Sequence, residues 1–390
     1  MIKYVGLGIL LLFSSCNLIH IIHRNFPDIS DYKIFTQVII RHASTPYEFH
    51  KRNENILLPP VKDWVITKTG KEASPYSKSV EQFLEETKTT SLLIVRGDSL
   101  IYENYFNGFD RSTTSQHFSL TKAVISLLTG IAIGEGKISG LDQPISNYIP
   151  MYASDDRGKV TIGQLLNMTA GFDCNDYDDQ LRFIRVYYAD DPIKFISKRK
   201  LRYSPGNKFA YSSFNSILLG MCLEKAFGQP LNTLIQDKIW TRIGTSFDAS
   251  IGVYEDNTPM AFGGLASYPV DLVKFGRLVA KGGNWNGDQI VPSDYIDGCR
   301  SKSEENGKTW RYSRGFWLDC YSCLKKEEIE TLKWPERSKN CNDENQLFGG
   351  GYRGQILFID VKKQLIILRL GTGDARKSWS LSISKLAELL

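Results

Sequence analysis

The sequence predicts an α+β fold with two lobes, in which an antiparallel sheet built from both chain ends is flanked by helices and a helical lobe is inserted between its strands. Three observations indicate this fold. Strand-like pairs occur at residues 91–106 and 354–370, and the segments from 119 to about 300 are mostly helix and loop. The length of 390 residues and the 42% hydrophobic content allow one large domain with an ample core.

The two strand pairs are predicted from apolar runs that turn residues interrupt. Residues 91–106 (SLLIVRGDSLIYENYF) break at Gly97-Asp98, which is a hairpin signal. The late pair consists of Gly354–Ile359 and Leu365–Leu370, separated by the segment 360–364 (DVKKQ). Each pair is expected to form a β-hairpin, and together they bring the two ends of the chain into one sheet.

Between the strand pairs, the clearest helix begins at Ser119. Its apolar residues recur at three- and four-residue spacing, which predicts a helix with one buried stripe: Leu120, Ala123, Val124, Leu127, Leu128 and Ile131. Gly134 and Gly136 mark the end of this helix. Residues 378–390 predict an amphipathic helix that closes the chain.

The N-terminus carries an export pattern. Lys3 precedes the apolar run Val5–Phe13, and two serines then precede Cys16. This pattern resembles a bacterial lipoprotein signal, in which Cys16 would be lipidated and become the first residue. Two alternatives remain open: Val5–Ile22 forms an uncleaved membrane anchor, or the segment is a simple secretion signal. Each alternative exports the domain, so we expect a protein facing the periplasm or the cell exterior, with a membrane attachment at its N-terminus.

We therefore divide the chain into three parts. Residues 1–16 are the signal peptide, of lipoprotein type or part of an anchor, and residues 17–85 are an N-terminal arm without a clear hydrophobic period. The main domain is expected over residues 86–390, where the predicted strands and helices lie.

The charge of the chain gives no sign of a nucleic-acid partner. The 48 basic and 43 acidic side chains nearly cancel to a formal charge of +5. Long basic runs and nucleic-acid-binding motifs are absent from the sequence, so we expect no nucleic-acid binding.

The cysteines suggest a cross-link rather than a metal site. Cys320-x-x-Cys323 with Cys341 nearby has some zinc-like spacing, but no fourth ligand stands close in the sequence. We expect no metal site, and we predict that Cys341 pairs with Cys320 or Cys323, because disulfides are common in exported chains. Cys222 lies in an apolar run and is predicted to be a small core residue.

Ser119-Leu-Thr-Lys122 is the strongest catalytic candidate. Residues three apart lie on one helical face, so the Lys122 amine can reach the Ser119 hydroxyl. Backbone N–H groups at a helix N-terminus favour developing negative charge, and a desolvated lysine can act as a base. The bare spacing is weak evidence, because it also occurs at Ser30–Lys33, Ser197–Lys200, Ser322–Lys325 and Ser382–Lys385. Only the copy at Ser119 opens a long apolar-striped helix, although a plain helix cap is the alternative.

The histidines exclude the usual hydrolase triad for this serine. None of the five follows Ser119, so the chain order nucleophile, acid, histidine is impossible. His117 lies two residues before Ser119, where helical geometry points the side chains apart, so we predict a structural role for it. The sequence also lacks G-x-S-x-G, H-E-x-x-H and Walker motifs. A serine enzyme here would use lysine or tyrosine as its base.

Five segments resemble the serine β-lactamase and penicillin-binding superfamily. The resemblance is greatest to its class C-like branch, and within that branch to the 6-aminohexanoate-dimer hydrolases and related esterases. The segments occur in the family's order and cover roughly residues 90–380: HFSLTKAVISLLTGIAIGEGKISGLDQPISNYIP (117–150), Val160–Phe172, Tyr203–Gly220, Gly263–Ser267 and Phe348–Gln355. The resemblance implies a β-lactamase/transpeptidase-like fold.

The resemblance also implies catalytic roles. Ser119 matches the acylated nucleophile, Lys122 its lysine partner, and Tyr211 the tyrosine of the family's Y-x-N element, which moves protons to and from the nucleophile and leaving group. Ser213 stands where most members have asparagine, which weakens the amide contacts expected for β-lactam or peptide substrates. Serine at this position fits the amide-hydrolase and esterase branch.

The family's third element is usually K-T-G on a late strand. The literal Lys68-Thr69-Gly70 precedes the nucleophile and is interpreted as a turn. The positional match is Tyr352-Arg353-Gly354, and these three residues and Ser213 are the predicted substrate-binding residues. Gly354 would let substrate approach the strand. Arg353 is the candidate to replace the missing cation, although strand alternation points it away from the side of Tyr352. The backbone N–H groups of Ser119 and Gln355 would form the oxyanion hole. Tyr352 replaces a lysine cation, which argues against β-lactamase or DD-peptidase activity.

The expected activity is hydrolysis of an amide or ester bond in a small molecule through an acyl-enzyme on Ser119, without metal or organic cofactor. Two other classes remain. One is a penicillin-binding, DD-peptidase-like or sensor protein that β-lactams acylate with little turnover. The other is a catalytically silent scaffold, which the intact set of Ser119, Lys122 and Tyr211 argues against.

Overall fold

The computed structural model describes residues 27–65, 79–176, 184, 186–189, 191–318, 344–373 and 379–390. Several predictions concern residues outside these ranges: lipidation at Cys16, the turn at Lys68–Gly70, and the pairing of Cys341 with Cys320 or Cys323. Within the described ranges, no helix combines the length and the apolar character needed to span a membrane.

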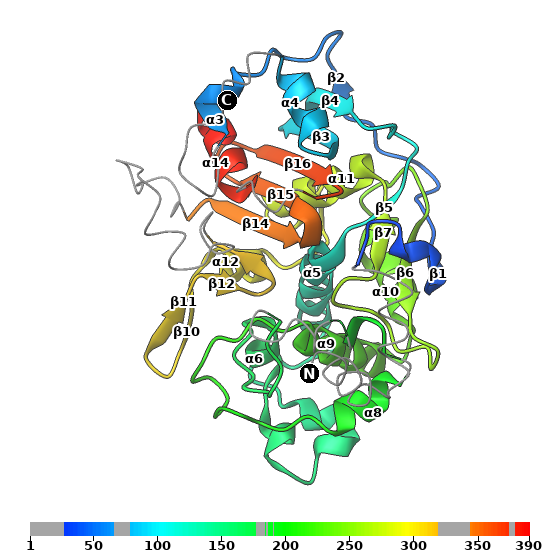
Figure 1. Cartoon of the computed structure of the whole chain (residues 1–390). Helices are drawn as coiled ribbons and strands as arrows, with labels where there is room; N and C mark the ends of the chain where they lie inside the picture. Colours follow the sequence, from blue (N-terminus) through cyan, green and yellow to red (C-terminus); the bar gives the residue numbers. More distant parts are fainter. Residues whose placement is uncertain are drawn as a thin grey trace, which may run out of the picture.

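An eight-stranded sheet forms one lobe, in the order β12-β13-β14-β15-β16-β3-β4-β2 (Figure 1). Its central strands come from the two predicted hairpins, β3 (Thr89–Arg96) with β4 (Ser99–Tyr105), and β15 (Gln355–Asp360) with β16 (Leu365–Gly371). The hairpins meet where β16 pairs antiparallel with β3, for example Leu368 with Leu93. The predicted sheet built from both chain ends is thus confirmed.

The remaining strands of this sheet lie at its two sides. The strand β14 (Gln346–Gly351) pairs antiparallel with β15, and the short strands β13 (Phe316–Trp317) and β12 (Tyr312–Ser313) continue the sheet beyond it. At the other side, β2 (His50–Lys51) pairs parallel with β4.

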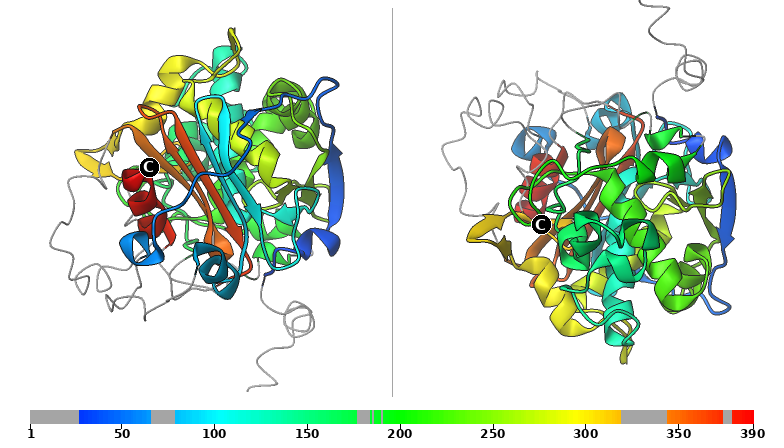
Figure 2. Two further views of the ribbon diagram at one scale, coloured as in Figure 1. Left: turned by 90° about the horizontal axis from the view of Figure 1, so that it is seen from above. Right: turned by 90° about the horizontal axis from the view of Figure 1, so that it is seen from below.

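Alternation along the strands sorts their side chains onto two apolar faces. Leu93, Val95 and Leu368 join one buried cluster, while Leu92 and Ile94 join the other. Helix α11 (Pro269–Ala280) covers the first face, where it contacts β15, β16 and β3. The second face is covered by α14 (Trp379–Leu389), α3 (Val61–Trp64) and α4 (Val80–Glu86), as Figure 2 shows. Burial on both faces explains the continuous apolar runs of these strands.

A second, four-stranded sheet was not predicted. Its order is β1 (Thr36–Ile40), β6 (Ala249–Val253), β7 (Leu265–Ser267) and β5 (Ser115–Gln116). Its three strand pairings are antiparallel, and β1 brings part of the N-terminal arm into it. The sheet positions the site, because β5 leads directly into the 3-10 turn η2 (Phe118–Leu120), which carries Ser119.

The helical lobe lies below the large sheet in Figure 1. It contains α6 (Ile162–Leu166), α8 (Pro192–Ser197), α9 (Ser213–Phe227), α10 (Leu231–Ile235) and the π-helical turn η6 (Gln236–Trp240). Short 3-10 turns connect them: η3 (Ile145–Asn147), η4 (Pro150–Tyr152) and η5 (Asp156–Lys159). The helix α9 contains Cys222, which is fully buried as predicted.

Helix α5 (Thr121–Gly134) joins the two lobes and differs from the prediction. We expected one buried stripe, but every residue from Thr121 to Ala132 is buried. The polar residues of this stretch are buried too, because α5 is enclosed by α9, α10 and the segment 312–317 rather than lying on a surface. A helix buried all round carries polar side chains where they have partners, and Lys122 is such a residue.

The remaining elements are short. They comprise η1 (Asp31–Lys33), the hairpin β8 (Asn284–Trp285) and β9 (Asp288–Gln289), α12 (Ser293–Arg300), the hairpin β10 (Ser303–Glu305) and β11 (Lys308–Trp310), and η7 (Tyr352–Gly354). The β10–β11 hairpin reaches the helical lobe, where the Glu305 carboxylate accepts a hydrogen bond of 2.6 Å from Gln164 Nε2.

Candidate active site

Ser119 lies in a tight turn between β5 and α5. Phe118, just before it, adopts φ 51°, a left-handed conformation that is strained for a residue with a side chain. The neighbouring strand keeps this backbone conformation in place, because the His117 N–H donates a hydrogen bond of 2.9 Å to the Leu265 carbonyl of β7. The turn leaves Ser119 partly exposed at the start of a buried helix.

Lys122 lies one helical turn after Ser119 and contacts it directly. Its Nζ donates to Ser119 Oγ at 2.8 Å, to the Phe262 carbonyl at 3.0 Å and to Ser213 Oγ at 3.3 Å. The residue is only 3% exposed. Burial lowers the pKa of Lys122 to about 8, although the Asp176 carboxylate opposes that shift. Lys122 is therefore available as a neutral amine near physiological pH, next to the hydroxyl it would deprotonate.

Tyr211 packs against the same lysine from a distant part of the chain. Its ring centroid lies 5.0 Å from Lys122 Nζ, and the residue precedes α9 by only a short link. Trp317 stacks on the Tyr211 ring at 5.4 Å, with an angle of 20° between the ring planes. Tyr312 meets it edge-on at 5.7 Å. The structure thus brings the three predicted catalytic residues together around the Lys122 amine.

Ser213 belongs to the interior of the site. It is 1% exposed, and its hydroxyl accepts from Lys122 and donates to Asp176 Oδ2 at 2.7 Å. The Ser213 backbone N–H, at the first turn of α9, also donates to both oxygens of that carboxylate, at 3.1 and 2.9 Å. We predicted Ser213 as a substrate-binding residue, and its recorded partners are Lys122 and Asp176.

Asp176 is a site residue that sequence reasoning missed. It lies in the acidic segment DCNDYDD (173–179), which was visible, but no motif or spacing linked it to Ser213. Although the residue as a whole is partly exposed, desolvation of its carboxylate raises the pKa of Asp176, against the lowering effects of Lys122 and the Ser213 hydrogen bonds. The backbone N–H of Asp176 also donates to the Tyr211 carbonyl at 2.9 Å.

His117 has the structural role that we predicted. Its side chain is fully buried, and Nε2 lies 2.7 Å from Ser267 Oγ of β7. Burial lowers the pKa of His117 to about 3, so the imidazole is neutral at physiological pH. Its recorded side-chain partner is Ser267 and not Ser119.

The segment Tyr352-Arg353-Gly354 is a turn, which corrects our expectation of a strand. Arg353 has φ 62° and Gly354 has φ 78°, so strand alternation does not describe where their side chains point. The Arg353 guanidinium donates to the carbonyls of Pro27 and Thr372, at 2.8 and 3.0 Å. A side chain at Gly354 would have its Cβ 2.7 Å from Nη1 of the buried Arg369, so glycine fits both the turn and this close packing. Arg353 and Gly354 therefore stabilise the backbone of the turn beside the site.

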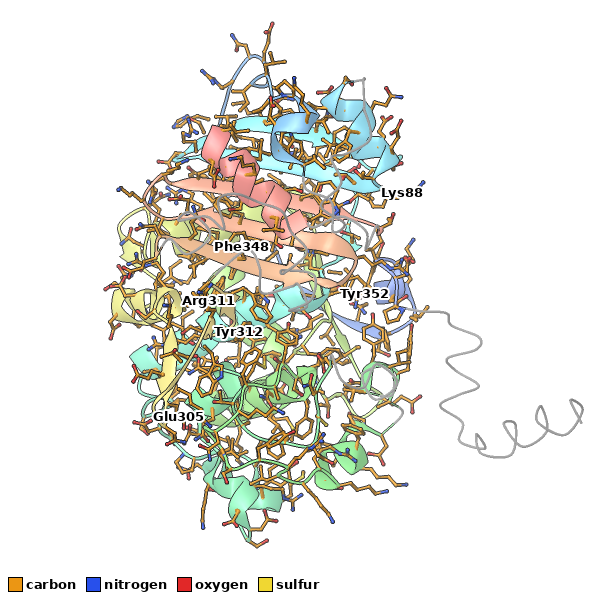
Figure 3. The ribbon with its side chains drawn as sticks, turned by 60° about the vertical axis from the view of Figure 1, so that its left-hand side comes forward. Lys88, Glu305, Arg311, Tyr312, Phe348 and Tyr352 are labelled. Atoms are coloured by element: carbon orange, nitrogen blue, oxygen red, sulfur yellow. The ribbon has the colours of Figure 1, made fainter. Side chains whose placement is uncertain are left out.

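Tyr352 is the member of this turn that reaches the surface. The side chain is 47% exposed, and its ring meets Phe118 edge-on at 5.6 Å. Figure 3 shows Tyr352 at one end of the large sheet and Tyr312 between that sheet and the helical lobe. Tyr352 can therefore contact a substrate that lies over Ser119.

Gln355 lies on β15, the strand that neighbours β14 in the large sheet. Its side chain is fully buried and donates to the carbonyls of Tyr352 and Gly371, at 3.2 and 2.6 Å. The end of β14 approaches the nucleophile turn closely, since a Cβ on Gly351 would lie 2.4 Å from the His117 carbonyl oxygen. The oxyanion role of the Gln355 N–H stays a prediction.

The acidic, histidine and cysteine side chains that the structure describes do not gather into a metal site. Over the described ranges, no group of three or more of these residues has an arrangement that could hold a metal ion.

A serine that contacts a buried lysine of lowered pKa is arranged for nucleophilic catalysis without histidine. The fold and the site define the class as serine hydrolases, with a lysine and a tyrosine beside the serine. Comparison with known proteins places the chain more narrowly. The family model described as Beta-lactamase matches residues 77–379, so the chain belongs to the β-lactamase family.

Individual relatives agree with this placement. The chain is 25% identical over 312 residues to the 6-aminohexanoate-dimer hydrolase of Paenarthrobacter ureafaciens, and the match covers 75% of each chain. A solved structure from Bacillus anthracis, whose name also refers to 6-aminohexanoate-dimer hydrolase, aligns with a TM-score of 0.74 at 20% identity, covering 93% of this chain and 92% of that one. A family VIII carboxylesterase aligns with a TM-score of 0.57 at 18% identity, covering 78% and 93%. These structural likenesses show the fold.

Proposed function

We propose that the protein hydrolyses an amide or ester bond in a small molecule through an acyl-enzyme on Ser119. The observation that carries this proposal is the 2.8 Å contact between Lys122 Nζ and Ser119 Oγ, made by an amine whose pKa is lowered to about 8. A neutral amine at hydrogen-bond distance can take the hydroxyl proton as the oxygen attacks a carbonyl carbon.

The first half of the reaction forms the acyl-enzyme. The Ser119 oxygen bonds to the substrate carbonyl carbon while Lys122 receives the hydroxyl proton. The developing negative charge on the carbonyl oxygen is stabilised by backbone N–H groups, of which that of Ser119 is the first. The second donor is the backbone N–H of Gln355, as the family resemblance implies.

The second half regenerates the enzyme. As the bond to the leaving amine or alcohol breaks, Tyr211 donates a proton to that group and regains one from Lys122, whose amine lies against the Tyr211 ring. Water then attacks the acyl carbon while Lys122 accepts one of its protons through Tyr211, and Lys122 returns that proton to the Ser119 oxygen as the acyl bond breaks. Losing one oxyanion donor in such a site typically costs about 3–4 kcal/mol of activation free energy.

The substrate class follows from the site and the relatives together. Tyr352 stands where penicillin-recognising members usually have a cation, and Ser213 is engaged with Asp176. Both features favour the amide-hydrolase and esterase branch over β-lactamase or DD-peptidase activity. The named activities of the Paenarthrobacter relative and of the carboxylesterase support the same choice.

The test is Ser119→Ala assayed with a short-chain p-nitrophenyl ester. We expect hydrolysis to be abolished while thermal stability stays nearly unchanged, because Ser119 is partly exposed and contributes little packing. Full retained activity would refute the nucleophile assignment. A fluorophosphonate probe and a labelled penicillin complete the design: labelling by both, with a burst but no turnover, would favour the penicillin-binding alternative.

We infer from the sequence that the enzyme is exported and held at the membrane through its N-terminus. The serines before Cys16 and the preceding apolar run support this inference. In a bacterial host, wild-type protein should fractionate with membranes and incorporate labelled palmitate, and Cys16→Ser should abolish the incorporation. A labelled Cys16→Ser protein would contradict lipidation at this residue, and a soluble wild-type protein would contradict the attachment itself.

A further inference from the structure

Asp176 closes a chain of hydrogen bonds that begins at the nucleophile. Ser119 Oγ accepts from Lys122 Nζ, Lys122 Nζ donates to Ser213 Oγ, and Ser213 Oγ donates to Asp176 Oδ2, over 2.8, 3.3 and 2.7 Å. A serine hydroxyl has a single proton and can rotate freely. Because that proton is taken up by the carboxylate, the Ser213 oxygen can only accept from Lys122.

The same carboxylate holds the backbone around the site. It accepts the Ser213 N–H at the start of α9, where the unpaired N–H groups of a helix favour a negative charge. The Asp176 N–H donates to the Tyr211 carbonyl at 2.9 Å. One residue is therefore bonded both to the chain that carries Tyr211 and to the hydroxyl that contacts Lys122.

We propose that Asp176 is a positioning residue that, through the Ser213 hydroxyl, aims the Lys122 amine at Ser119 and fixes the segment that carries Tyr211. Asp176 forms and breaks no bond in this role and exchanges no proton with substrate. The inference rests on the proposed function for its kinetic consequences, while the hydrogen-bond chain itself does not depend on which substrate is hydrolysed.

The charges around Lys122 allow the proposed role of Asp176 to be measured through the pKa of Lys122. The elements packed against Lys122 present Tyr211, the Ser213 hydroxyl, the Phe262 carbonyl and ring, and Asp176. His117, which precedes η2, is neutral and contributes no charge. Among the described residues, the negative charge that acts on Lys122 is that of Asp176. Replacing Asp176 by a neutral residue should therefore lower the pKa of Lys122 further.

The experiment compares Asp176→Asn with Asp173→Asn in the full-length protein. Asparagine keeps the shape of the side chain and one acceptor oxygen but removes the charge. Asp173 is a matched control from the same segment, because its carboxylate accepts from the Lys200 N–H at 3.1 Å and pairs with Arg199, away from Lys122. Two readouts are taken: kinetics with a p-nitrophenyl ester, and the titration of Lys122 followed by NMR of ¹³Cε-labelled lysine, which needs no activity.

We expect Asp176→Asn to lower kcat at least tenfold with KM changed less than twofold, and to shift the Lys122 titration to lower pH. Asp173→Asn should change neither readout. Asp176→Glu, which restores the charge, should return the titration toward that of the wild type. An unchanged kcat and an unchanged Lys122 titration in folded Asp176→Asn protein would overturn the proposal.

A double-variant comparison tests the route through Ser213. If Asp176 acts through that hydroxyl, the losses of kcat in Ser213→Ala and Asp176→Asn should not multiply in the double variant. Fully multiplicative losses would show that Asp176 acts by another path. If Asp176→Asn fails to fold, Ser213→Ala breaks the same chain at the hydroxyl between Lys122 and Asp176 and must lower kcat by at least tenfold. A wild-type protein without hydrolase activity would refute the proposed function, whereas the NMR titration would still decide the role of Asp176.

Discussion

Lys122 is subject to two opposing effects. Burial favours the neutral amine, while the negative charge of the Asp176 carboxylate favours the ammonium. Burial has the larger effect, since the pKa of Lys122 falls to about 8. A base with this pKa is partly neutral at pH 7 and remains basic enough to take a proton from serine.

This pKa predicts the pH dependence of catalysis. Because the reactive form of Lys122 is the neutral amine, kcat/KM for an uncharged ester should rise about tenfold per pH unit below 8 and level off above it. The measurement is a pH–rate profile between pH 6 and 9.5, corrected for spontaneous hydrolysis. A profile that is flat across pH 8 would contradict Lys122 as the base. Lys122→Arg, which stays protonated throughout, is expected to be inactive over the whole range.

The residues of the site differ in how far sequence alone can find them. Ser119 and Lys122 are recognisable because their spacing is local, and a helix fixes what lies one turn away. Tyr211 required the resemblance to a known family, since packing from far along the chain brings it to Lys122. Asp176 contacts Ser213 across a loop of no regular period, so no local pattern reveals the contact.

At the scale of elements, the contact between β14 and the nucleophile turn is unusually tight. Gly351 ends β14 with ordinary extended dihedral angles, so its backbone conformation does not require glycine. The close approach of the His117 carbonyl does require it, because a Cβ would lie 2.4 Å from that oxygen. The absence of a side chain at Gly351 therefore sets the distance between the strand and Ser119.

We predict that Gly351→Ala lowers kcat at least tenfold and destabilises the protein by about 1–3 kcal/mol, as overpacking of a buried contact does. Gly263→Ala is the matched control: its Cβ would meet the backbone of Phe118 at 3.6 Å, an ordinary contact distance. Kinetics and thermal melting of both variants check the prediction. Equal behaviour of the two would mean that β14 does not control the geometry at Ser119.

Two elements show why local patterns mislead here. The turn Tyr352–Gly354 follows a glycine-rich stretch and precedes an apolar strand, so the sequence reads as one continuous strand. Two consecutive left-handed residues, Arg353 and Gly354, break it, and Arg369 bonds to their carbonyls at 3.3 and 2.8 Å. The apolar spacing of α5 is a second example. It predicts one buried stripe, but hydrophobic periodicity contains no information about neighbouring elements that also bury the polar residues of the helix.

At the scale of the whole molecule, the N-terminal arm is joined to both sheets. The strand β1 pairs along its whole length with β6, and β2 pairs with β4. The Ile29 carbonyl accepts from the Gln116 N–H at 2.9 Å, three residues before the nucleophile. The carboxyl of Asp31 accepts from the hydroxyls of Tyr187 and Tyr188 at 3.0 and 3.3 Å.

These contacts predict how far the chain can be shortened. A chain that begins at residue 41 loses β1, Ile29 and Asp31, so we expect a melting temperature lower by several degrees or more and a reduced activity, since each lost hydrogen bond costs about 1 kcal/mol. A chain that begins at residue 27 keeps every one of these contacts and should melt and hydrolyse like the full-length protein. Equal melting of both shortened chains would show that the arm contributes no stability.

Sequence reasoning found the large sheet because each of its two hairpins is a local signal. Sequence reasoning did not find the second sheet, and the reason is physical. Its strands are two to five residues long and come from three distant stretches of the chain, so pairing across space, and not local propensity, decides that they form. Burial of β3 and β16 on both faces likewise depends on helices that close from different parts of the chain.

The pairing of β3 with β16, the last strand of the chain, has a consequence for the order in which the protein can be made. Arg96 pairs with Leu365, so the sheet cannot close until nearly the whole polypeptide has been synthesised. Helix α5 emerges from the ribosome early, but β14, which completes the surroundings of Ser119, emerges among the last residues. A fragment that ends before residue 346 would carry Ser119 and Lys122 without β14, so we expect it to lack hydrolase activity.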